Sequence, residues 1–305
     1  MLKLWFTLLM LCGLAAFAGE PSVVLAAVGD VMLARTVPAQ VAAHNAAWLW
    51  EPLAPYLEGT DIRFCNLECT VAAGGQPFPK PYSFRADPKL AADVLSAGGI
   101  TVAALANNHT YDYGRPGLAA TMKSLDTLRI AAPGAGIGRA GAVAPRVLES
   151  NGLRVAFIAY TCWTPEYYLP SDDKAALATF DKDTFSEELK TAKAEADVLV
   201  VSLHWGLEYS EAVSPRQREI ARAAIDAGAD LILGHHPHVR QPVEIYHDRP
   251  ILYSLGNCIF DRGAGSGAHT PSGSLARVRL AKGAATLERL VIFDIENARP
   301  SLPSR

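Results

Sequence analysis

Apolar runs typical of buried strands alternate with segments of helical periodicity along most of the chain. A short, nearly continuous apolar run bounded by turn residues is typical of a strand that is covered on both faces. Strands that alternate with helices form βαβ units, so we expect an α/β fold with a mostly parallel sheet. The predicted strands are Val23–Val28, Asp61–Cys65, Ile100–Leu105, Arg154–Tyr160, Asp197–Leu203 and Ala229–Leu233.

Helix start signals stand between these runs. Asp87-Pro88 predicts an N-cap and a first helical residue, and Gly98-Gly99 predicts the end of that helix. Thr184 to Glu187 and Ser214 to Gln217 have the spacing of capping boxes, each ahead of an apolar stripe. We therefore expect helices after Asp87, Thr184 and Ser214.

Two segments are rich in Pro, Gly or Ser and predict loops: residues 74–82 and residues 262–273. We expect one domain with two stacked sheets, covering residues 19–305. The last third has a different pattern, with short strands that we expect to pair mainly antiparallel. They are Val243–Tyr246, Ile251–Ser254, Ser274–Leu280 and Thr286–Ile295.

Residues 1–18 have the pattern of a cleaved export signal. Lys3 precedes an apolar stretch from Leu4 to Leu14, and Ala16-Phe17-Ala18 is a small-x-small cleavage signature before Gly19. The apolar stretch is shorter than the roughly 20 residues of a membrane span, which disfavours an uncleaved anchor. We expect a periplasmic or secreted protein with no transmembrane segment after cleavage.

Composition narrows the class of partner. The chain has 305 residues, 50% of them hydrophobic, and a formal net charge of −3. It has no run of Lys and Arg that could follow a phosphate backbone, so we expect no nucleic-acid partner.

Cysteines beside strand-like runs are ordinary core residues, and a domain of this size does not need disulfides. The cysteines after the predicted signal are Cys65, Cys69, Cys162 and Cys258.

Polar residues follow the predicted strands at the point where each strand ends. The sequence Gly234-His235-His236-Pro237-His238 comes directly after one strand, and His204 ends another. A polar loop facing water would explain the histidine cluster alone. However, the other strand ends carry Asp30, Asn66-Leu67-Glu68 and Asn107-Asn108-His109. Open α/β sheets place their sites at this edge, so we expect these side chains to form one site.

The mixture of side chains indicates a metal centre. Carboxylates, an amide oxygen and imidazoles suit a divalent ion such as Mn, Fe or Zn. Thiolates are missing from the set, which disfavours a structural zinc site. Carboxylates can also hold two cations close together, so the expected cofactor is a binuclear divalent metal.

As an ordered set, the motifs resemble the CapA family of capsule and poly-γ-glutamate synthesis proteins, a branch of the calcineurin-like metallophosphoesterase superfamily. The resemblance covers residues 23–262. It implies a four-layer α/β/β/α sandwich of two mixed sheets, metallophosphoesterase-like, with a metal site at the strand ends. The motifs are Gly29-Asp30-Val31-Met32, Asn66-Leu67-Glu68, Asn107-Asn108-His109, His204-Trp205-Gly206, Gly234 to His238 and Tyr253-Ser254-Leu255-Gly256-Asn257.

The resemblance also implies roles for single residues. Glu68, rather than Asn66, would take the place of the bridging carboxylate. His109 would act beside the metals as a catalytic imidazole together with Asn108, stabilising charge or protonating a leaving group. The implied metal ligands are Asp30, Glu68, Asn108, His204, His236 and His238.

One position departs from the wider superfamily. Its first motif is Asp-x-His, whereas this chain has Asp30-Val31-Met32, and a thioether is a poor ligand for these ions. The first metal site would then be weaker, differently filled or empty. Glu208 and Asp261 are candidate partners of the ligating histidines. Arg85, which could pair with a carboxylate, and Asn66 are the candidate substrate-binding residues.

Three functions remain open from the sequence. The first is an exported metal-dependent hydrolase or transferase that acts on an anionic polymer, such as poly-γ-glutamate or capsular material. The second is a phosphoesterase of the calcineurin-like class. The third is a non-catalytic protein that binds the polymer and helps export it, which the methionine at position 32 favours.

Overall fold

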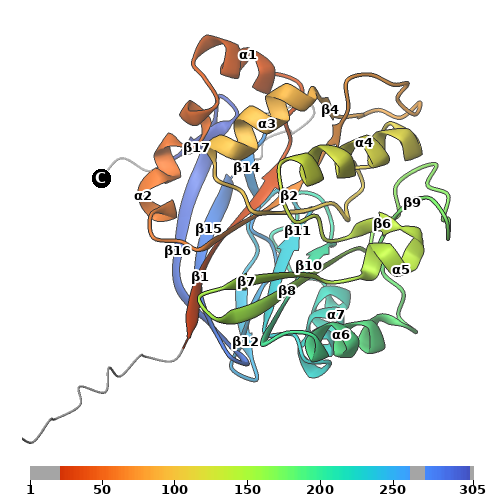
Figure 1. The fold of residues 1–305 in the computed structure, drawn as a ribbon. Coiled ribbons are helices and arrows are strands. Elements are labelled where there is room, and N and C mark those ends of the chain that lie inside the picture. Colours follow the sequence, from red (N-terminus) through yellow and green to blue (C-terminus); the bar gives the residue numbers. More distant parts are fainter. Residues whose placement is uncertain (1–20, 262–271, 303–305) are drawn as a thin grey trace, which may run out of the picture.

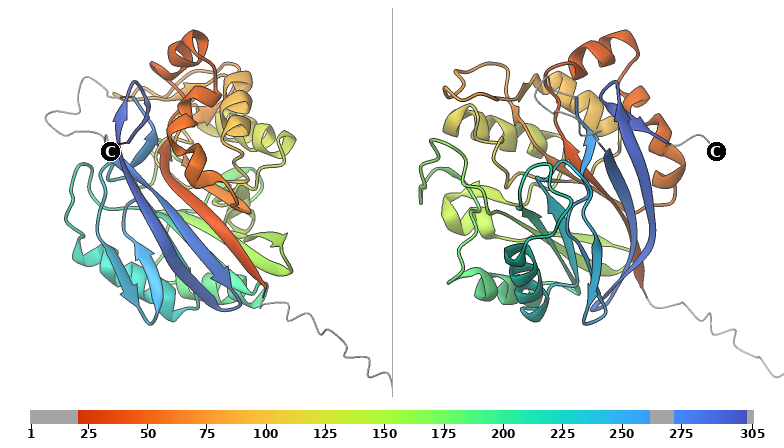
Figure 2. Two further views of the ribbon diagram at one scale, coloured as in Figure 1. Left: turned by 90° about the vertical axis from the view of Figure 1, so that its left-hand side faces the viewer. Right: turned by 180° about the vertical axis from the view of Figure 1, so that it is seen from behind.

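Two β-sheets pack face to face and carry helices on their outer faces, as the views in Figures 1 and 2 show. The computed structural model describes residues 21–261 and 272–302. The predicted signal, residues 1–18, and nearly all of the predicted loop 262–273 lie outside these ranges. Within them, no helix has the length and apolar character needed to cross a membrane.

The first sheet contains seven strands in the described part of the chain. Its strand order is β17-β16-β15-β1-β2-β5, and β14 pairs with the end of β1. The strands β1, β2 and β5 are parallel, whereas β15, β16 and β17 run antiparallel to their neighbours. The bounds are β1 Ser22–Val31, β2 Ile62–Leu67, β5 Val102–Ala104, β14 Asn257–Ile259, β15 Ser272–Ala281, β16 Ala284–Glu296 and β17 Arg299–Ser301.

The second sheet has the order β12-β13-β11-β10-β8-β7, again counted over the described residues. Its four central strands are parallel, and β7 and β12 pair antiparallel at its edges. The bounds are β7 Arg146–Ser150, β8 Leu153–Thr161, β10 Val198–His204, β11 Leu231–His235, β12 Val243–Tyr246 and β13 Arg249–Leu252. Two small pairs lie outside both sheets: β3 Thr70–Val71 with β4 Arg85–Ala86, and β6 Ala135–Ile137 with β9 Ala175–Leu177.

Alternation along the strands produces the layers. In β8, Val155 and Phe157 face the other sheet, whereas Ala156 and Ile158 face the helices, because successive side chains of a strand point to opposite faces. The central core lies between the sheets. Helices α2 Ala54–Leu57, α3 Pro88–Ala97 and α4 Gly114–Thr127 pack on the first sheet, and α5 Gly138–Val143, α6 Phe185–Ala194 and α7 Pro215–Asp226 pack on the second. Helix α1 Val37–Ala43 and the 3-10 turns Ala47–Leu49 and Glu51–Leu53 complete the set.

The helix start signals have mixed outcomes. Asp87 caps α3 by accepting from the Lys89 amide at 2.8 Å, and Ser214 and Gln217 form the expected capping box of α7. At α6 the helix is confirmed but the capping box is wrong. The Thr184 hydroxyl accepts instead from Arg139 at 3.1 Å, so a tertiary contact takes the group that a cap would use.

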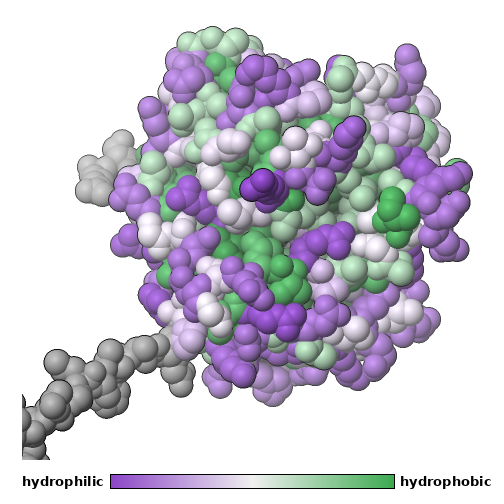
Figure 3. Space-filling model, in the orientation of Figure 1, coloured by the Kyte–Doolittle hydropathy of each residue, from purple (hydrophilic) through white to green (hydrophobic). Residues whose placement is uncertain are grey.

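The four-layer α/β/β/α architecture is confirmed. The strands of the last third are longer than expected, since β15 and β16 cover 10 and 13 residues. One of them, β13, belongs to the parallel part of the second sheet, because it pairs parallel with β11. Apolar side chains gather in the middle of the face drawn in Figure 3, with hydrophilic residues around them. The described cysteines, Cys65, Cys69, Cys162 and Cys258, are free thiols.

Candidate metal centre

The first sheet contributes two carboxylates and an amide at the carboxyl ends of its parallel strands. Asp30 near the end of β1 lies in register with Asn66 of β2, and Glu68 follows directly after β2. All three side chains are buried. Backbone strands cross closely here: a Cβ on Gly29 would lie 1.9 Å from the Gly256 carbonyl oxygen, so only glycine fits.

The second sheet contributes the histidines. His204 ends β10 in register with His235 at the end of β11, and His236 and His238 follow in the next loop. His236 and His238 have φ angles of +93° and +58°, a backbone region that non-glycine residues rarely occupy. Such strained positions cluster at functional sites, because surrounding structure must hold them.

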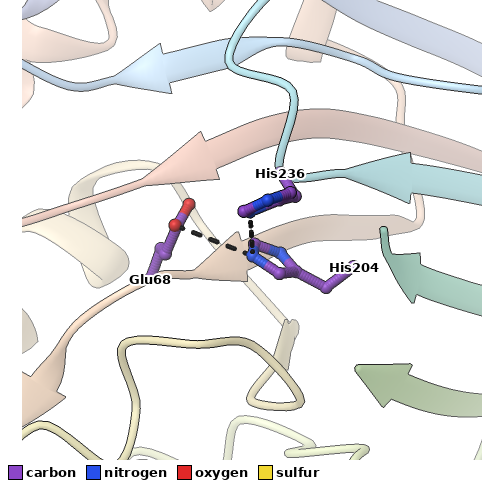
Figure 4. A group of neighbouring side chains, drawn as sticks. All are labelled: Glu68, His204 and His236. Atoms are coloured by element: carbon purple, nitrogen blue, oxygen red, sulfur yellow. Dashed lines mark hydrogen bonds and ion pairs between the residues drawn. The ribbon is translucent and has the colours of Figure 1, made fainter. Parts of the chain in front are cut away.

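One group of side chains converges on the His204 Nε2 atom. The Asn108 Oδ1 atom lies 2.8 Å from it, the His236 Nδ1 atom 3.1 Å and the Glu68 Oε1 atom 3.8 Å. Figure 4 shows Glu68, His204 and His236 pointing toward one another from separate segments. These groups could therefore hold one cation between them.

A second group shares Glu68. The His238 ring lies between the two carboxylates, with Nδ1 at 3.3 Å from Asp30 Oδ2 and Nε2 at 3.8 Å from Glu68 Oε1. Asp30, Glu68 and His238 could hold a second cation. Asn257 also contacts this ring, with its Oδ1 atom 3.0 Å from His238 Nδ1.

The bonding state of Glu68 fits a cation. Both carboxylate oxygens are buried, and neither has a hydrogen-bond partner among the residues that the structure describes. A buried charge without partners is costly, and a metal ion is one of the partners that compensates for it. The neighbouring donors are imidazole nitrogens, carboxylate oxygens and an amide oxygen, the set that suits Mn, Fe or Zn.

The histidines on the His204 side are held in the neutral form that binds metals. Burial and the neighbouring His236 lower the pKa of His204 well below its usual value. Burial and the charge of His238 lower the pKa of His236 to about 3. Both rings are thus available as ligands without first losing a proton.

The carboxylate side has the opposite balance. Burial and the charge of Asp30 raise the pKa of Glu68 well above its usual value. Burial opposes the charged form of His238, but the charges of Glu68 and Asp30 raise the pKa of His238 to about 10. Burial likewise opposes the charged form of Asp30, but His235 and His238 hold its pKa well below the usual range. In the absence of metal, a proton therefore stays bound among Asp30, Glu68 and His238, at the place where a cation could bind instead.

His109 lies beside this cluster and is oriented by an acid. Its Nδ1 atom is 2.9 Å from Asp112 Oδ2, and the Lys80 ammonium is 2.5 Å from the other oxygen of Asp112. Lys80 also donates to the Asn108 carbonyl at 3.2 Å. With Nδ1 engaged, Nε2 is the ring nitrogen that can reach a substrate.

A cavity of about 290 Å³ adjoins the cluster. The Trp163 ring lies 5.3 Å from the His236 ring and is anchored by a hydrogen bond from its Nε1 to the Gly206 carbonyl. The cavity gives a ligand access to the buried histidines. Its lining includes Lys80, Asn108, Trp163, Glu166, Glu208 and His236.

Comparison with known proteins identifies the family. The model described as "Bacterial capsule synthesis protein PGA_cap" matches residues 24–262. The chain belongs to this family. It is 31% identical to the PGA biosynthesis protein CapA of Bacillus subtilis over 282 residues, 90% of this chain and 72% of that protein. It is 32% identical to the capsule biosynthesis protein CapA of Bacillus anthracis over 281 residues, 90% of this chain and 67% of that protein.

Solved structures confirm the metallophosphoesterase-like fold. A phosphatase from Mycoplasma pneumoniae superposes with a TM-score of 0.55 at 15% identity, covering 93% of this chain and 96% of that one. The calcineurin-like phosphoesterase YfkN from Bacillus subtilis superposes with a TM-score of 0.51 at 16% identity, covering 92% of each chain.

The structure brings most of the predicted site residues of this PGA_cap protein together. The residues that share the cluster or touch it are Asp30, Asn66, Glu68, Asn108, His204, His236 and His238, and His109 lies beside them, bonded to Asp112. Asn66 is buried, and its Nδ2 donates to Asp30 Oδ1 at 2.9 Å while its Oδ1 accepts from Asn107. Its amide therefore organises the cluster from within.

Arg85 lies apart from the cluster. Its guanidinium donates to the Ala72 carbonyl at 2.8 Å and lies over the Tyr113 ring. Asp261 was expected to contact a ligating histidine, which is wrong: it accepts from Arg35 and Thr36. Glu208 does lie near His236 and His238. Met32 is buried in the core, and its sulfur accepts from the Ala34 amide at 3.1 Å.

Sequence reasoning assigned no positioning role to several residues that shape the site. Lys80 belongs to the proline-rich loop 74–82, where no local pattern distinguishes it. Asn107 accepts from the amides of His109 and Thr110 and so shapes the loop that carries the catalytic candidates. Asn257 was noted only as part of a motif. Its place after a run of strand residues was the available signal.

Proposed function

We propose that the protein is an exported hydrolase that depends on a divalent metal and acts on poly-γ-glutamate or a related anionic capsule polymer. The observation that carries this proposal is the unpartnered, buried Glu68 carboxylate, which lies among His204, His236 and His238 next to an open cavity. A binding surface alone has no use for such a cluster. A bound Mn, Fe or Zn ion would supply Lewis acidity toward a carbonyl or phosphoryl oxygen.

Cationic and aromatic groups near the cluster support an anionic polymer as substrate. Lys80 lines the cavity, and the Arg35 guanidinium lies 4.8 Å from the Phe84 ring, whose centre is 4.3 Å from that of His109. Poly-γ-glutamate carries a carboxylate on every residue, which such cations can attract. The two CapA relatives are named for the biosynthesis of this polymer and of capsule.

His109 is the proposed proton-transfer residue. Asp112 and Lys80 fix its ring through Nδ1 and leave Nε2 for the substrate. Burial lowers the pKa of His109, although Asp112 opposes this effect. A neutral imidazole near neutral pH can exchange a proton with a leaving group or with water. Asn108 would hold its loop beside the substrate through contact with His204.

Export is part of the proposal. Residues 1–18 would act as a cleaved signal, and residues 19–305 would form the mature domain in the periplasm or outside the cell. The expected partner is the polymer itself.

The test uses mature protein from Gly19, loaded with Mn, Fe or Zn in separate samples. Each sample is incubated with poly-γ-glutamate, and polymer size and newly formed amino groups are measured. We expect shortening by the wild type and a loss of about 100-fold or more in His236→Ala, since it lacks a ligand. His247→Ala is the matched control, because His247 is exposed and outside the cluster.

The other outcomes separate the alternatives. If the loaded wild type leaves the polymer intact but cleaves phosphodiesters, the substrate assignment is overturned and the phosphoesterase remains. If it cleaves neither and still binds polymer after the His236→Ala change, the hydrolase is overturned and the non-catalytic polymer-binding protein remains.

A further inference from the structure

Glu208 lies at the outer side of the metal centre, on the turn that follows β10. Its carboxylate and the ring nitrogens of His236 and His238 lie within 4.8 Å of one another. Glu208 is exposed and lines the same cavity as His236. It therefore reaches the histidines from the solvent side, whereas Asp30 and Glu68 reach them from the buried side.

The backbone holds this turn against the histidine loop. The Tyr209 amide donates to the Pro237 carbonyl at 2.7 Å, between the two histidines in sequence. Gln241 donates from Nε2 to the carbonyls of Ser210 at 2.9 Å and Ala212 at 3.1 Å. These bonds fix the turn without using the Glu208 side chain, so its carboxylate remains available to a ligand.

The group of Asp30, Glu68 and His238 offers few inner donors. Asp30, Glu68 and His238 supply three side chains, and the Met32 side chain packs into the core, with its sulfur bonded to the Ala34 amide. The position that holds histidine in the Asp-x-His motif therefore provides no ligand. Two inner carboxylates also balance only half the charge of two divalent ions, and a third carboxylate brings the sum closer to neutral.

We propose that Glu208 is a metal ligand. It would bind a cation on the solvent side of the cluster together with the ring nitrogens of His236 and His238, and would add a side-chain donor that Met32 does not provide. The ligand is a divalent cation of the Mn, Fe or Zn class. This inference rests on the metal centre of the proposed function and does not depend on which bond is cleaved.

The experiment measures metal binding without any substrate. Metal-free protein is titrated with Mn²⁺ by calorimetry, and the loaded samples are compared by electron paramagnetic resonance at low temperature. The variants are Glu208→Gln and the matched control Glu166→Gln. Glu166 is also exposed and lines the same cavity, but it belongs to no group of possible metal ligands among the described residues.

We expect the wild type and Glu166→Gln to take up two ions and to show the spectrum of a coupled pair. Glu208→Gln should keep one ion, bind the other at least about tenfold more weakly and show an uncoupled spectrum. Equal stoichiometry and affinity in Glu208→Gln and wild type would overturn the proposal. A wild type that takes up a single ion would overturn it as well.

These outcomes are separable from those of the proposed function. A wild type that binds two ions through Glu208 but cleaves no polymer contradicts the hydrolase alone. A wild type that shortens the polymer with one ion contradicts the role of Glu208 alone.

Discussion

Two buried acids at opposite ends of the parallel strands show how this fold separates structural from functional charge. Asp230, just before β11, is 2% exposed, and its Oδ2 accepts from Lys193 Nζ at 2.7 Å and the Leu199 amide at 2.8 Å. Arg249 lies 3.2 Å from its other oxygen. Glu68, just after β2, is 0% exposed, and within the described part of the chain neither of its oxygens has a hydrogen-bond partner.

Other acids near the amino ends of the strands also have hydrogen-bond partners, as Asp230 does. Asp61 accepts from the Val24 amide at 2.7 Å, and Asp197 accepts from the Arg154 amide at 3.0 Å. These acids join neighbouring strands. The acids at the carboxyl ends, Asp30 and Glu68, face imidazoles instead. Because burial and Asp30 raise the pKa of Glu68, the metal-free protein must take up a proton there when it folds at neutral pH, and this lowers its stability.

The largest expected effect comes from Glu68→Gln, which removes the carboxylate shared by both groups of ligands. We expect affinity for both ions to fall about 100-fold or more, because each group loses its common anion. The metal-free variant should be more stable than the metal-free wild type by about 1–3 kcal/mol at neutral pH, because the raised pKa of Glu68 makes folding of the wild type take up a proton, whereas Gln is neutral without one. Metal content by mass spectrometry and thermal unfolding measure the two effects. A destabilised metal-free variant would contradict the comparison.

Asp230→Asn should show the reverse behaviour. It removes the anion that pairs with Lys193 and Arg249 and should lower the free energy of unfolding by about 2–4 kcal/mol, toward the lower part of the usual range because both cations reach solvent. Metal content per folded molecule should match the wild type. Urea unfolding followed by metal analysis tests this, and loss of metal without loss of stability would count against it.

Metal removal sharpens the comparison further. At a free ion concentration of about 100 times Kd, bound metal stabilises a site by about 2.7 kcal/mol, and a chelator should remove that amount. Wild type and Asp230→Asn should both lose it, whereas Glu68→Gln, with its affinity lowered about 100-fold or more, should lose at most about 0.4 kcal/mol. Thermal unfolding with and without chelator gives the answer. A response in Glu68→Gln equal to that of wild type would show that the ions bind elsewhere.

The smallest effect concerns pH and Asp197. The hydrogen bond from the Arg154 amide lowers the pKa of Asp197, burial opposes this effect, and the charges of Lys282, Arg154 and Lys193 lower the pKa further. Its stabilisation is therefore present above the unfolded pKa of about 3.9 and is lost as pH falls through the lower folded value. The stability difference between wild type and Asp197→Asn should shrink between pH 7 and pH 3. A difference independent of pH would contradict this assignment.

Local signals in the sequence predicted much of the fold. The positions of the main buried strands along the chain followed from apolar runs, because the pattern of a strand depends only on its neighbours in the chain, whereas the order of the strands within each sheet did not. The caps at Asp87 and Ser214 were also predictable, since their partners lie two or three residues away. Thr184 shows the limit of this reasoning. Residues 184–187 have the sequence of a capping box, but the Thr184 hydroxyl accepts a hydrogen bond from Arg139, 45 residues away in sequence.

The sequence by itself determined which residue types stand at the strand ends, and so the chemistry available there: Asp30, Glu68, Asn108, His204, His236 and His238. Only the tertiary structure decided how they meet. The two sheets must pack before Asp30 and His238, 208 residues apart in number, come within 3.3 Å. The same packing places the Met32 side chain in the core and Glu208 beside the histidines. Contacts between distant segments depend on the whole fold, which no local pattern records.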